Sequence, residues 1–466
     1  MAHRRVRVGV VVALVAGLLG FAGPDAARAE PAPPRVSSVR PGLHDFPFTL
    51  GCCYYDFGEI GYTLREYFVS GTAKTYTTPV RTAPFTTRIV VALPKDPSRF
   101  NGTVLAEWEN VTAQAPAQPG MVWMHHYMLP RGFGYMAVSA QAAGVNLMRI
   151  WDPFRYEKLA HPGDDFSFDI YSQSVAAIRT VSGGESTKQL IGYGQSQSAG
   201  RLNSYATGVQ NDAKVLNGLI IQADGGNRKS FPNLTIPLIQ LETEDAIVAT
   251  APDQRNPKDL YRLWEVVGTA HIGNEETQSP GTFTLPLALT IGTPIPWDLD
   301  RRFWEHSHYG EEGPGLGLTC VGGTEMPVRY VLDAALEAMR TWIAGGPAAA
   351  QPPRAKFDAF GAIQRDRFGN ALGGLRLPPI DVPVATYSAT TCDLLGSTTP
   401  LLPTQLLELY PTHESYVAKM QGATDRAVRQ GIMVQADADQ LMRKVRRSTI
   451  PIWRPSTQFG LFEGGI

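Results

Sequence analysis

This sequence has almost no excess of charge of either sign. Its 42 lysine and arginine residues nearly balance its 43 aspartate and glutamate residues, which leaves a formal net charge of −1. A nucleic-acid-binding protein usually presents a basic face, and a sequence this balanced offers none. We therefore expect no nucleic-acid partner.

Long hydrophobic runs are missing everywhere except near the N-terminus. There an arginine-rich start (residues 3–7) precedes an apolar stretch (residues 8–21), and Ala27 and Ala29 supply the small residues that a signal peptidase needs. The apolar stretch is short for a bilayer span, so the pattern predicts a cleaved signal peptide over residues 1–29. The mature protein should then be secreted and extracellular, without stable membrane insertion.

Cysteines are few, at Cys52, Cys53, Cys320 and Cys392. An even number in an exported chain predicts two disulfides, for which four cysteines allow three pairings. A bridge between adjacent cysteines is strained, so Cys52 and Cys53 should each pair with a distant partner. The sequence has no CxxC motif with a matching histidine cluster, and we expect no metal site.

Internal repeats are also absent, and short apolar runs alternate instead with polar segments. The runs that we interpret as strands cover residues 62–77, 87–93, 102–108, 134–141, 188–193, 218–222, 237–243 and 263–268. Several are continuously apolar, which is typical of strands covered on both faces of a mostly parallel sheet. With a helix expected over residues 170–181, the alternation predicts an α/β fold, in which helices flank a central sheet.

The rest of the chain is divided by its composition. Residues 30–40 are rich in proline and alanine, as in a flexible linker, and residues 330–344 have one apolar face and form a helix that glycines end. We expect a core over residues 30–350. The turn-rich and then helical segment over residues 351–466, helical from 405 to 447, should be a C-terminal extension that packs on it.

An insertion at about residues 272–328 is expected inside the core. It carries several large aromatic side chains, at Trp297, Phe303, Trp304 and Tyr309. We interpret it as part of a lid over an apolar pocket.

The segment QLIGYGQSQSAGR, residues 189–201, predicts a strand, a tight turn and a helix. A nucleophilic serine on such a turn needs small residues two positions before and after it, because the backbone there is strained and crowded. Ser196 has Gly194 and Ser198 at these positions. We favour Ser196 over Ser198, because the turn around Ser198 would fall inside the helix.

A serine nucleophile requires a base, and the base requires an orienting acid. In this architecture they follow the serine along the chain as acid and then histidine, each after a strand. His271 follows the strand predicted over residues 263–268 and is the candidate base. Glu244 and Asp245 follow the preceding strand, where alternation would point them in opposite directions, so only one can serve.

Backbone N–H groups should stabilise the oxyanion that forms during the reaction. One donor is expected from Gln197, the residue after the nucleophile. The other should come from the loop after the strand at residues 102–108, where Asn110 and Val111 are the candidates.

Several stretches together resemble a bacterial α/β-hydrolase-domain family of largely uncharacterised serine hydrolases. They are REYFVSGTAKTY from Arg65, VLAEWENVT from Val104, RGFGYMAVSAQAAGV from Arg131, WDPFRYEKLAHPGDDFSFDIYSQ from Trp151, GQSQSAGRL from Gly194, WEVVGTAH from Trp264 and GGLRLPPIDVPVATY from Gly373. The resemblance covers most of the mature chain and implies an α/β-hydrolase fold. It also implies Ser196 as nucleophile, His271 as base and Glu244, which follows a threonine, as acid, with Asp245 as the alternative.

The sequence thus predicts a secreted serine hydrolase that cleaves carboxylic esters, including lactones, without metal or organic cofactor. Its substrate would be a small-molecule or lipid-like ester, attacked by Ser196 to form an acyl-enzyme. Two other interpretations stay open. The same triad could serve an acyltransferase or a peptidase or amidase, or the fold could belong to a non-catalytic exported binding protein.

Overall fold

The computed structural model describes most of the chain, namely residues 33–44, 46–49, 56–183, 186–225, 234–250, 260–273, 323–392 and 394–452. These residues belong to a compact unit that begins at Pro33. The expected signal peptide, Cys52, Cys53, Cys320 and the four aromatic residues of the expected lid lie outside the described residues. Among the described helices, none is both long and apolar enough to cross a membrane.

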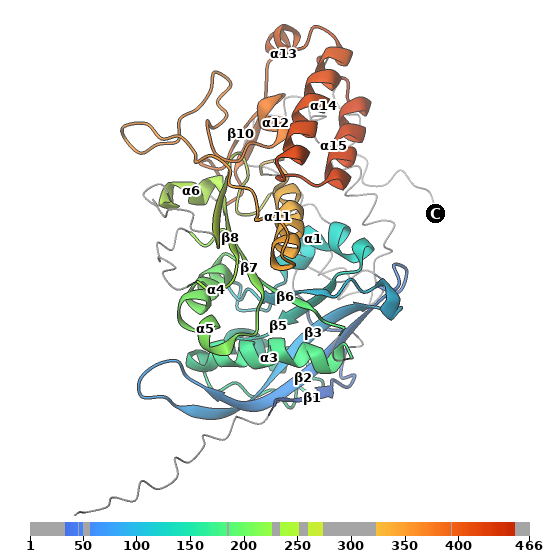
Figure 1. Cartoon of the computed structure of the whole chain (residues 1–466), viewed down its shortest axis with the longest axis vertical. Helices are drawn as coiled ribbons and strands as arrows, with labels where there is room; N and C mark the ends of the chain where they lie inside the picture. The colour runs from blue at the N-terminus through green and yellow to red at the C-terminus, as the bar shows by residue number, and fades with distance from the viewer. Residues whose placement is uncertain are drawn as a thin grey trace, which may run out of the picture. The chain divides into compact units, whose positions relative to one another are not determined.

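A nine-stranded sheet forms the centre of the described unit, in the order β1-β2-β3-β5-β4-β6-β7-β8-β9 (Figure 1). Its strands are β1 (Arg35–Ser38), β2 (Tyr62–Lys74), β3 (Thr82–Pro94), β4 (Thr103–Trp108), β5 (Gly134–Val138), β6 (Gln189–Gln195), β7 (Gly218–Gln222), β8 (Leu238–Thr243) and β9 (Tyr261–Val266). The pairs β1–β2, β2–β3 and β3–β5 are antiparallel, and every pair from β5 to β9 is parallel. The C-terminal ends of β4, β6, β8 and β9 therefore share one edge, where ligands bind in open α/β sheets.

Helices cover both faces of this sheet, as the continuous apolar runs predicted. The helices up to the last core strand are α1 (Pro119–Met128), α2 (Ala142–Trp151), α3 (Ser167–Val181), α4 (Gln197–Gly208), α5 (Gln210–Ala213) and α6 (Glu244–Thr250), with 3₁₀ turns η1 (Pro97–Arg99), η2 (Leu129–Arg131) and η3 (Asp164–Phe166). The helix α11 (Val328–Ile343) lies beside α1 on one side of the sheet, with α4 and α5 on the other (Figure 1). Ile191 and Ile220 pack on the side of α1 and α11, whereas Leu190 and Leu219 pack on the side of α3 and α4. Every position of β4, β7 and β8 is buried as a result.

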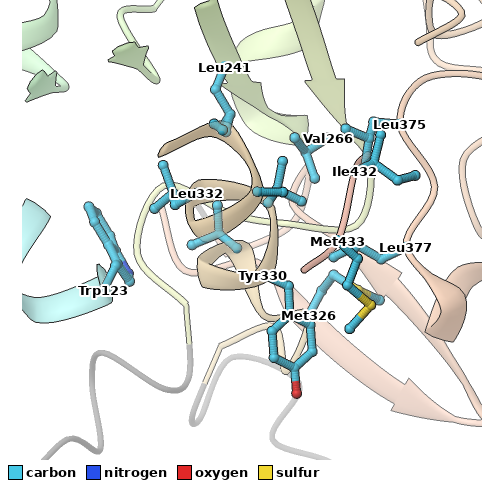
Figure 2. Close-up of a cluster of buried hydrophobic side chains, with 14 of the residues drawn as sticks. Trp123, Leu241, Val266, Met326, Tyr330, Leu332, Leu375, Leu377, Ile432 and Met433 are labelled. Atoms are coloured by element: carbon cyan, nitrogen blue, oxygen red, sulfur yellow. The ribbon is translucent and has the colours of Figure 1, made fainter. Parts of the chain in front are cut away.

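The chain after residue 350 shares a core with the sheet. Its elements are α12 (Pro378–Asp381), β10 (Ala385–Ser388), β11 (Ser397–Pro400), α13 (Pro403–Leu409), α14 (His413–Arg429) and α15 (Gln435–Arg447). Figure 2 shows Leu375 and Ile432 from this part gathered with Val266 of β9 and Leu332 of α11. The C-terminal extension thus packs next to the strand that precedes His271.

Two expectations from the sequence need correction. The segment 30–40, interpreted as a flexible linker, contains β1, because Arg35–Ser38 forms an antiparallel pair with the β2 edge about 30 residues later. The helical segment expected over residues 405–447 is three helices, since Pro411 separates α13 from α14 and Gly431, at a φ of 70°, separates α14 from α15.

Candidate active site

Ser196 lies at a strained turn between β6 and α4. Its φ of 59° and ψ of −122° are unusual for a residue with a side chain, and its side chain is half-buried. Strain of this kind persists only where the surroundings enforce it, and it is typical of functional sites. This conformation is the one that a strand–turn–helix nucleophile elbow requires.

The neighbours of Ser196 explain why the turn needs small residues. A Cβ atom on Gly194 would lie 2.8 Å from the backbone oxygen of Ser198, so only glycine fits there without a shift. The buried Ser198 hydroxyl donates to the Gln195 carbonyl at 2.9 Å and accepts from the Gln195 N–H at 3.0 Å. Ser198 therefore braces the elbow, and its hydroxyl is already engaged.

The two residues considered for the second oxyanion donor differ in their backbone bonds. The N–H of Asn110 donates to the Ala117 carbonyl at 3.0 Å, and its side-chain amide donates to the Gln195 carbonyl at 2.9 Å. The N–H of Val111 makes a long bond of 3.4 Å to the side-chain oxygen of Gln197. The N–H of Asn110 is thus occupied, which favours Val111, the other candidate, as the second oxyanion donor.

Gln197 begins α4, and its N–H is one of the first four of the helix. Such N–H groups have no partner within their helix and make a helix N-terminus attractive to negative charge. The N–H groups of Gln197 and Val111 lie on the two segments that the Gln197 side chain joins. This is the arrangement expected of a pair of oxyanion donors.

Glu244 and Asp245 are the first two residues of α6 rather than the end of a strand. The Glu244 side chain is fully buried and its carboxylate is engaged on both oxygens. Oε1 accepts from Nη2 of Arg365 at 2.7 Å, and Oε2 accepts from the N–H of Gly268 at 2.6 Å. Glu244 therefore faces the C-terminal extension and the turn that precedes His271.

Asp245 is the carboxylate that faces the histidine. Its Oδ2 lies 3.7 Å from Nδ1 of His271, and the side chains are 16% and 13% exposed. Its Oδ1 is buried and has no hydrogen-bond partner among the described residues. The geometry therefore favours Asp245, the alternative acid, over Glu244 as the residue that orients His271. The 3.7 Å separation is longer than a hydrogen bond.

Burial shifts the proton affinities of this pair in opposite directions. Burial raises the pKa of Asp245 to about 6, and the negative charge of Glu244 adds to the rise. Burial also lowers the pKa of His271 below its ordinary value of 6.5. At neutral pH His271 is therefore neutral and able to accept a proton, while Asp245 is ionised.

The elbow and the histidine loop are joined through Gln195. Its side-chain Nε2 lies 3.5 Å from the backbone oxygen of His271, and its carbonyl accepts from the Asn110 side chain. Since β6, β7, β8 and β9 run parallel in one sheet, the segments that carry Ser196, Asp245 and His271 leave it at the same edge. The segments that carry the candidate residues thus meet at one edge of the sheet, where the geometry favours Asp245 as acid and Val111 as donor.

The sequence did not predict the residues of the C-terminal extension that donate hydrogen bonds to Glu244. Arg365 is 121 positions from Glu244, and Ala389, whose N–H also donates to Glu244 at 3.3 Å, is farther still. No local motif marks either residue, and only their place in a turn-rich segment after the core could have drawn attention to them.

The described part of the chain contains no group of three or more His, Cys, Asp or Glu side chains placed to hold a metal ion. Cys392 is the one cysteine among the described residues, and it is not a free thiol. The pairing of the four cysteines stays a prediction.

Comparison with known proteins identifies a family for most of the chain. A family model described as "Alpha/beta hydrolase domain" matches residues 30–443. No match was found among curated protein sequences.

Solved structures give distant matches. They include an α/β serine hydrolase without a lid from Xanthomonas campestris, at 12% identity and a TM-score of 0.29, covering 42% of this chain and 83% of that chain. A glucuronoyl esterase from Solibacter usitatus matches at 10% identity and a TM-score of 0.26, covering 46% and 69%. A cold-adapted esterase from an Arctic intertidal metagenomic library matches at 14% identity and a TM-score of 0.29, covering 43% and 84%. Because these TM-scores are low, the fold assignment rests on the family match and the sheet topology.

Proposed function

The chain belongs to the alpha/beta hydrolase domain family and is a hydrolase of that fold, and from this premise we propose that it cleaves carboxylic esters with Ser196, His271 and Asp245. The observation that carries the proposal is the Asp245–His271 pair, which lies at the sheet edge where Ser196 occupies its strained turn. A hydroxyl nucleophile, an acid and a base in this chain order are the parts of a serine hydrolase.

In the proposed reaction, Ser196 attacks the ester carbonyl while His271 takes the hydroxyl proton. The N–H groups of Gln197 and Val111 donate to the oxyanion of the tetrahedral intermediate, and Asp245 stabilises the imidazolium. His271 then gives its proton to the leaving alcohol, which leaves an acyl group on Ser196. A water molecule, deprotonated by His271, attacks the acyl-enzyme, and the acid product leaves as Ser196 regains its proton.

The proposal also includes where the enzyme acts and which kind of ester it accepts. The N-terminal pattern supports export with cleavage of residues 1–29, and the aromatic residues of the expected lid support an apolar ester or lactone as substrate. No step above needs a metal ion or an organic cofactor.

A fluorophosphonate probe tests the nucleophile directly, because it reacts with an activated serine. We expect labelling of the wild-type protein, loss of labelling in Ser196→Ala, and labelling retained in Ser198→Ala, whose hydroxyl only braces the Gln195 backbone. A wild-type protein that is folded but not labelled would indicate a binding protein and contradict the proposal.

A panel of p-nitrophenyl esters, with and without alcohol acceptors, tests the reaction itself. Hydrolysis at a rate that does not depend on the acceptor supports an esterase. Acyl transfer to the alcohol as the main product would reassign the same triad to an acyltransferase, and cleavage of anilides in preference to esters would reassign it to an amidase.

A further inference from the structure

The C-terminal extension supplies a side chain to the proposed active site. We propose that Arg365 and Glu244 form an ion pair that holds the loop carrying His271 in register with Asp245, an inference that rests on the esterase function above. Neither residue would touch the substrate, so both would be positioning residues.

Glu244 ties α6 to the turn before His271. Its Oε2 accepts from the N–H of Gly268 at 2.6 Å, and its own N–H donates to the Thr269 carbonyl at 2.9 Å. Two bonds from one residue thus fix two consecutive residues of the turn. Because Asp245 follows Glu244 directly and His271 follows the turn, the same bonds set the spacing between acid and base.

Arg365 makes this arrangement stable for a buried carboxylate. Its Nη2 donates to Glu244 at 2.7 Å and to the Thr390 hydroxyl at 3.0 Å, while its Nη1 donates to the Gly369 carbonyl at 3.0 Å. The C-terminal extension itself therefore holds the Arg365 guanidinium in the position from which it donates to Glu244. Arg365 is the one cation paired with Glu244 among the described residues. A buried carboxylate that loses such a partner is destabilising, and the loop would have to rearrange around it.

The same extension also holds the other side of the histidine loop. The N–H of Ile272, next to His271, donates to the Leu394 carbonyl at 2.9 Å. Leu375 pairs with the end of β9, where its N–H donates to Glu265 at 2.6 Å and its carbonyl accepts from Val267. His271 thus lies between two backbone attachments to the extension, and Arg365 adds a charged attachment through Glu244.

The charges around Asp245 predict how the pH profile should shift in variants of Arg365 and Glu244. Among the described residues, Glu244, Glu242 and His271 face Asp245, and Asp224 lies next to Glu242. Burial is the main cause of the raised pKa of Asp245, and the charge of Glu244 raises it further. Arg365 offsets that charge, so removing Arg365 and removing the charge of Glu244 should act on Asp245 in opposite directions.

The test measures kcat, KM and the acidic limb of the pH profile for p-nitrophenyl ester hydrolysis in full-length variants. We expect Arg365→Gln and Glu244→Gln each to lower kcat by about 10–100-fold with KM unchanged, because a misplaced catalytic group loses rate rather than binding. The acidic limb should move to higher pH in Arg365→Gln and to lower pH in Glu244→Gln. Arg365→Lys keeps the charge, so its limb should stay at the wild-type position.

Arg367 provides a matched control two residues along the chain. It pairs with Glu408 at 3.3 Å, and both side chains are 65% exposed. Arg367→Gln should leave kcat, KM and the acidic limb as in the wild type, because exposed pairs contribute little. If Arg365→Gln behaves like Arg367→Gln, or if both limbs move in the same direction, the proposal is wrong.

Two further measurements keep the test decisive if Arg365→Gln folds poorly. Millimolar guanidinium should restore activity to Arg365→Ala, since Arg365 is 26% exposed and its site can be reached from solvent. Hydrogen exchange of the Gly268 amide should be faster in Arg365→Lys than in Arg367→Gln. Absence of both effects would overturn the proposal.

These outcomes are separate from failure of the proposed function. If wild-type activity survives Ser196→Ala, the esterase mechanism is wrong, whatever the Arg365 variants do. If activity depends on Ser196 but not on Arg365, the mechanism stands and the positioning pair does not.

Discussion

The two sides of the candidate active site are held in place by ion pairs of different construction. On the oxyanion side, Glu109 precedes Asn110 and accepts from Arg88, which also donates to Glu66 at 3.1 Å. The side chains of these three residues are fully buried. Burial by itself lowers the pKa of Arg88, but Glu109, Tyr156 and Glu66 raise it above its ordinary value.

On the acid–base side, a single arginine reaches Glu244 from the C-terminal extension and stays 26% exposed. The oxyanion side is thus built from neighbouring strands and closed to water, whereas the acid–base side depends on a distant segment that faces solvent. From this difference we expect the oxyanion loop to be more rigid than the segments that carry the acid and the base. The position of the acid and base can be changed with less damage to the fold.

The largest effect should come from the acid. Asp245→Asn should lower kcat by about 10²–10⁴-fold, because an amide cannot stabilise the imidazolium or hold the required tautomer. Ester hydrolysis measured with Glu244→Gln in parallel provides the comparison. A greater loss in Glu244→Gln than in Asp245→Asn would return the role of acid to Glu244.

The next effect concerns stability and separates the two sides. Arg88→Met leaves Glu66 and Glu109 buried without this cation and should lower the free energy of unfolding by about 3–5 kcal/mol. Arg365→Gln should lower it by about 1–2 kcal/mol, because its side chain is partly solvated. Urea denaturation measures both.

Arg81 is a suitable control for these two variants. It pairs with Asp165, and both side chains are more than half exposed. Arg81→Gln should change the free energy of unfolding by less than about 0.5 kcal/mol. Equal losses of unfolding free energy in Arg88→Met and Arg365→Gln would show that the oxyanion side and the acid–base side do not differ in this way.

The pH dependence of unfolding should show that the ionised form of Asp245, which the reaction needs, lowers the stability of the folded protein. The pKa of Asp245 is about 6 in the folded protein against an ordinary 3.8, so the folded state holds the proton longer as pH rises. The free energy of unfolding should therefore fall as the pH rises from about 4 to about 6, by up to about 3 kcal/mol. Activity should rise over the upper part of this range, as Asp245 ionises and His271 becomes neutral.

Asp245→Asn separates these two trends. The variant should be more stable than the wild type at pH 7 and at most slightly more stable at pH 3.5, where Asp245 is mostly protonated in both states. Thermal unfolding at the two pH values measures the difference. A variant that is less stable at pH 7 would show that Asp245 contributes to folding rather than opposing it.

Much of the fold could be predicted from the sequence because it depends on local patterns. The core strands β2 to β9 follow from the apolar runs, several of which are continuous, and α11 follows from its apolar face. β1 could not be predicted, since its sequence resembles a linker and its partner strand decides its conformation.

The same distinction applies to the candidate site. Ser196 and His271 follow from local motifs and chain order, and the structure places both segments at one sheet edge. Choosing between Glu244 and Asp245 required knowledge of Arg365, which lies far away in the sequence. Choosing between Asn110 and Val111 required the bond of Asn110 to Ala117. What the sequence could not supply was the set of long-range partners.

The last comparison concerns the elbow, which lies between the two sides. A Cβ atom on Gly194 would lie 2.8 Å from the Ser198 backbone oxygen, so Gly194→Ala should lower the free energy of unfolding by about 1–3 kcal/mol and displace Ser196. At Gly200 no described atom lies within 4 Å of the added Cβ, and Gly200→Ala in α4 should stabilise the protein by up to about 1 kcal/mol. Thermal unfolding and fluorophosphonate labelling distinguish the two variants. Equal tolerance at both glycines would mean that the turn is not tight, and that neither side is positioned through it.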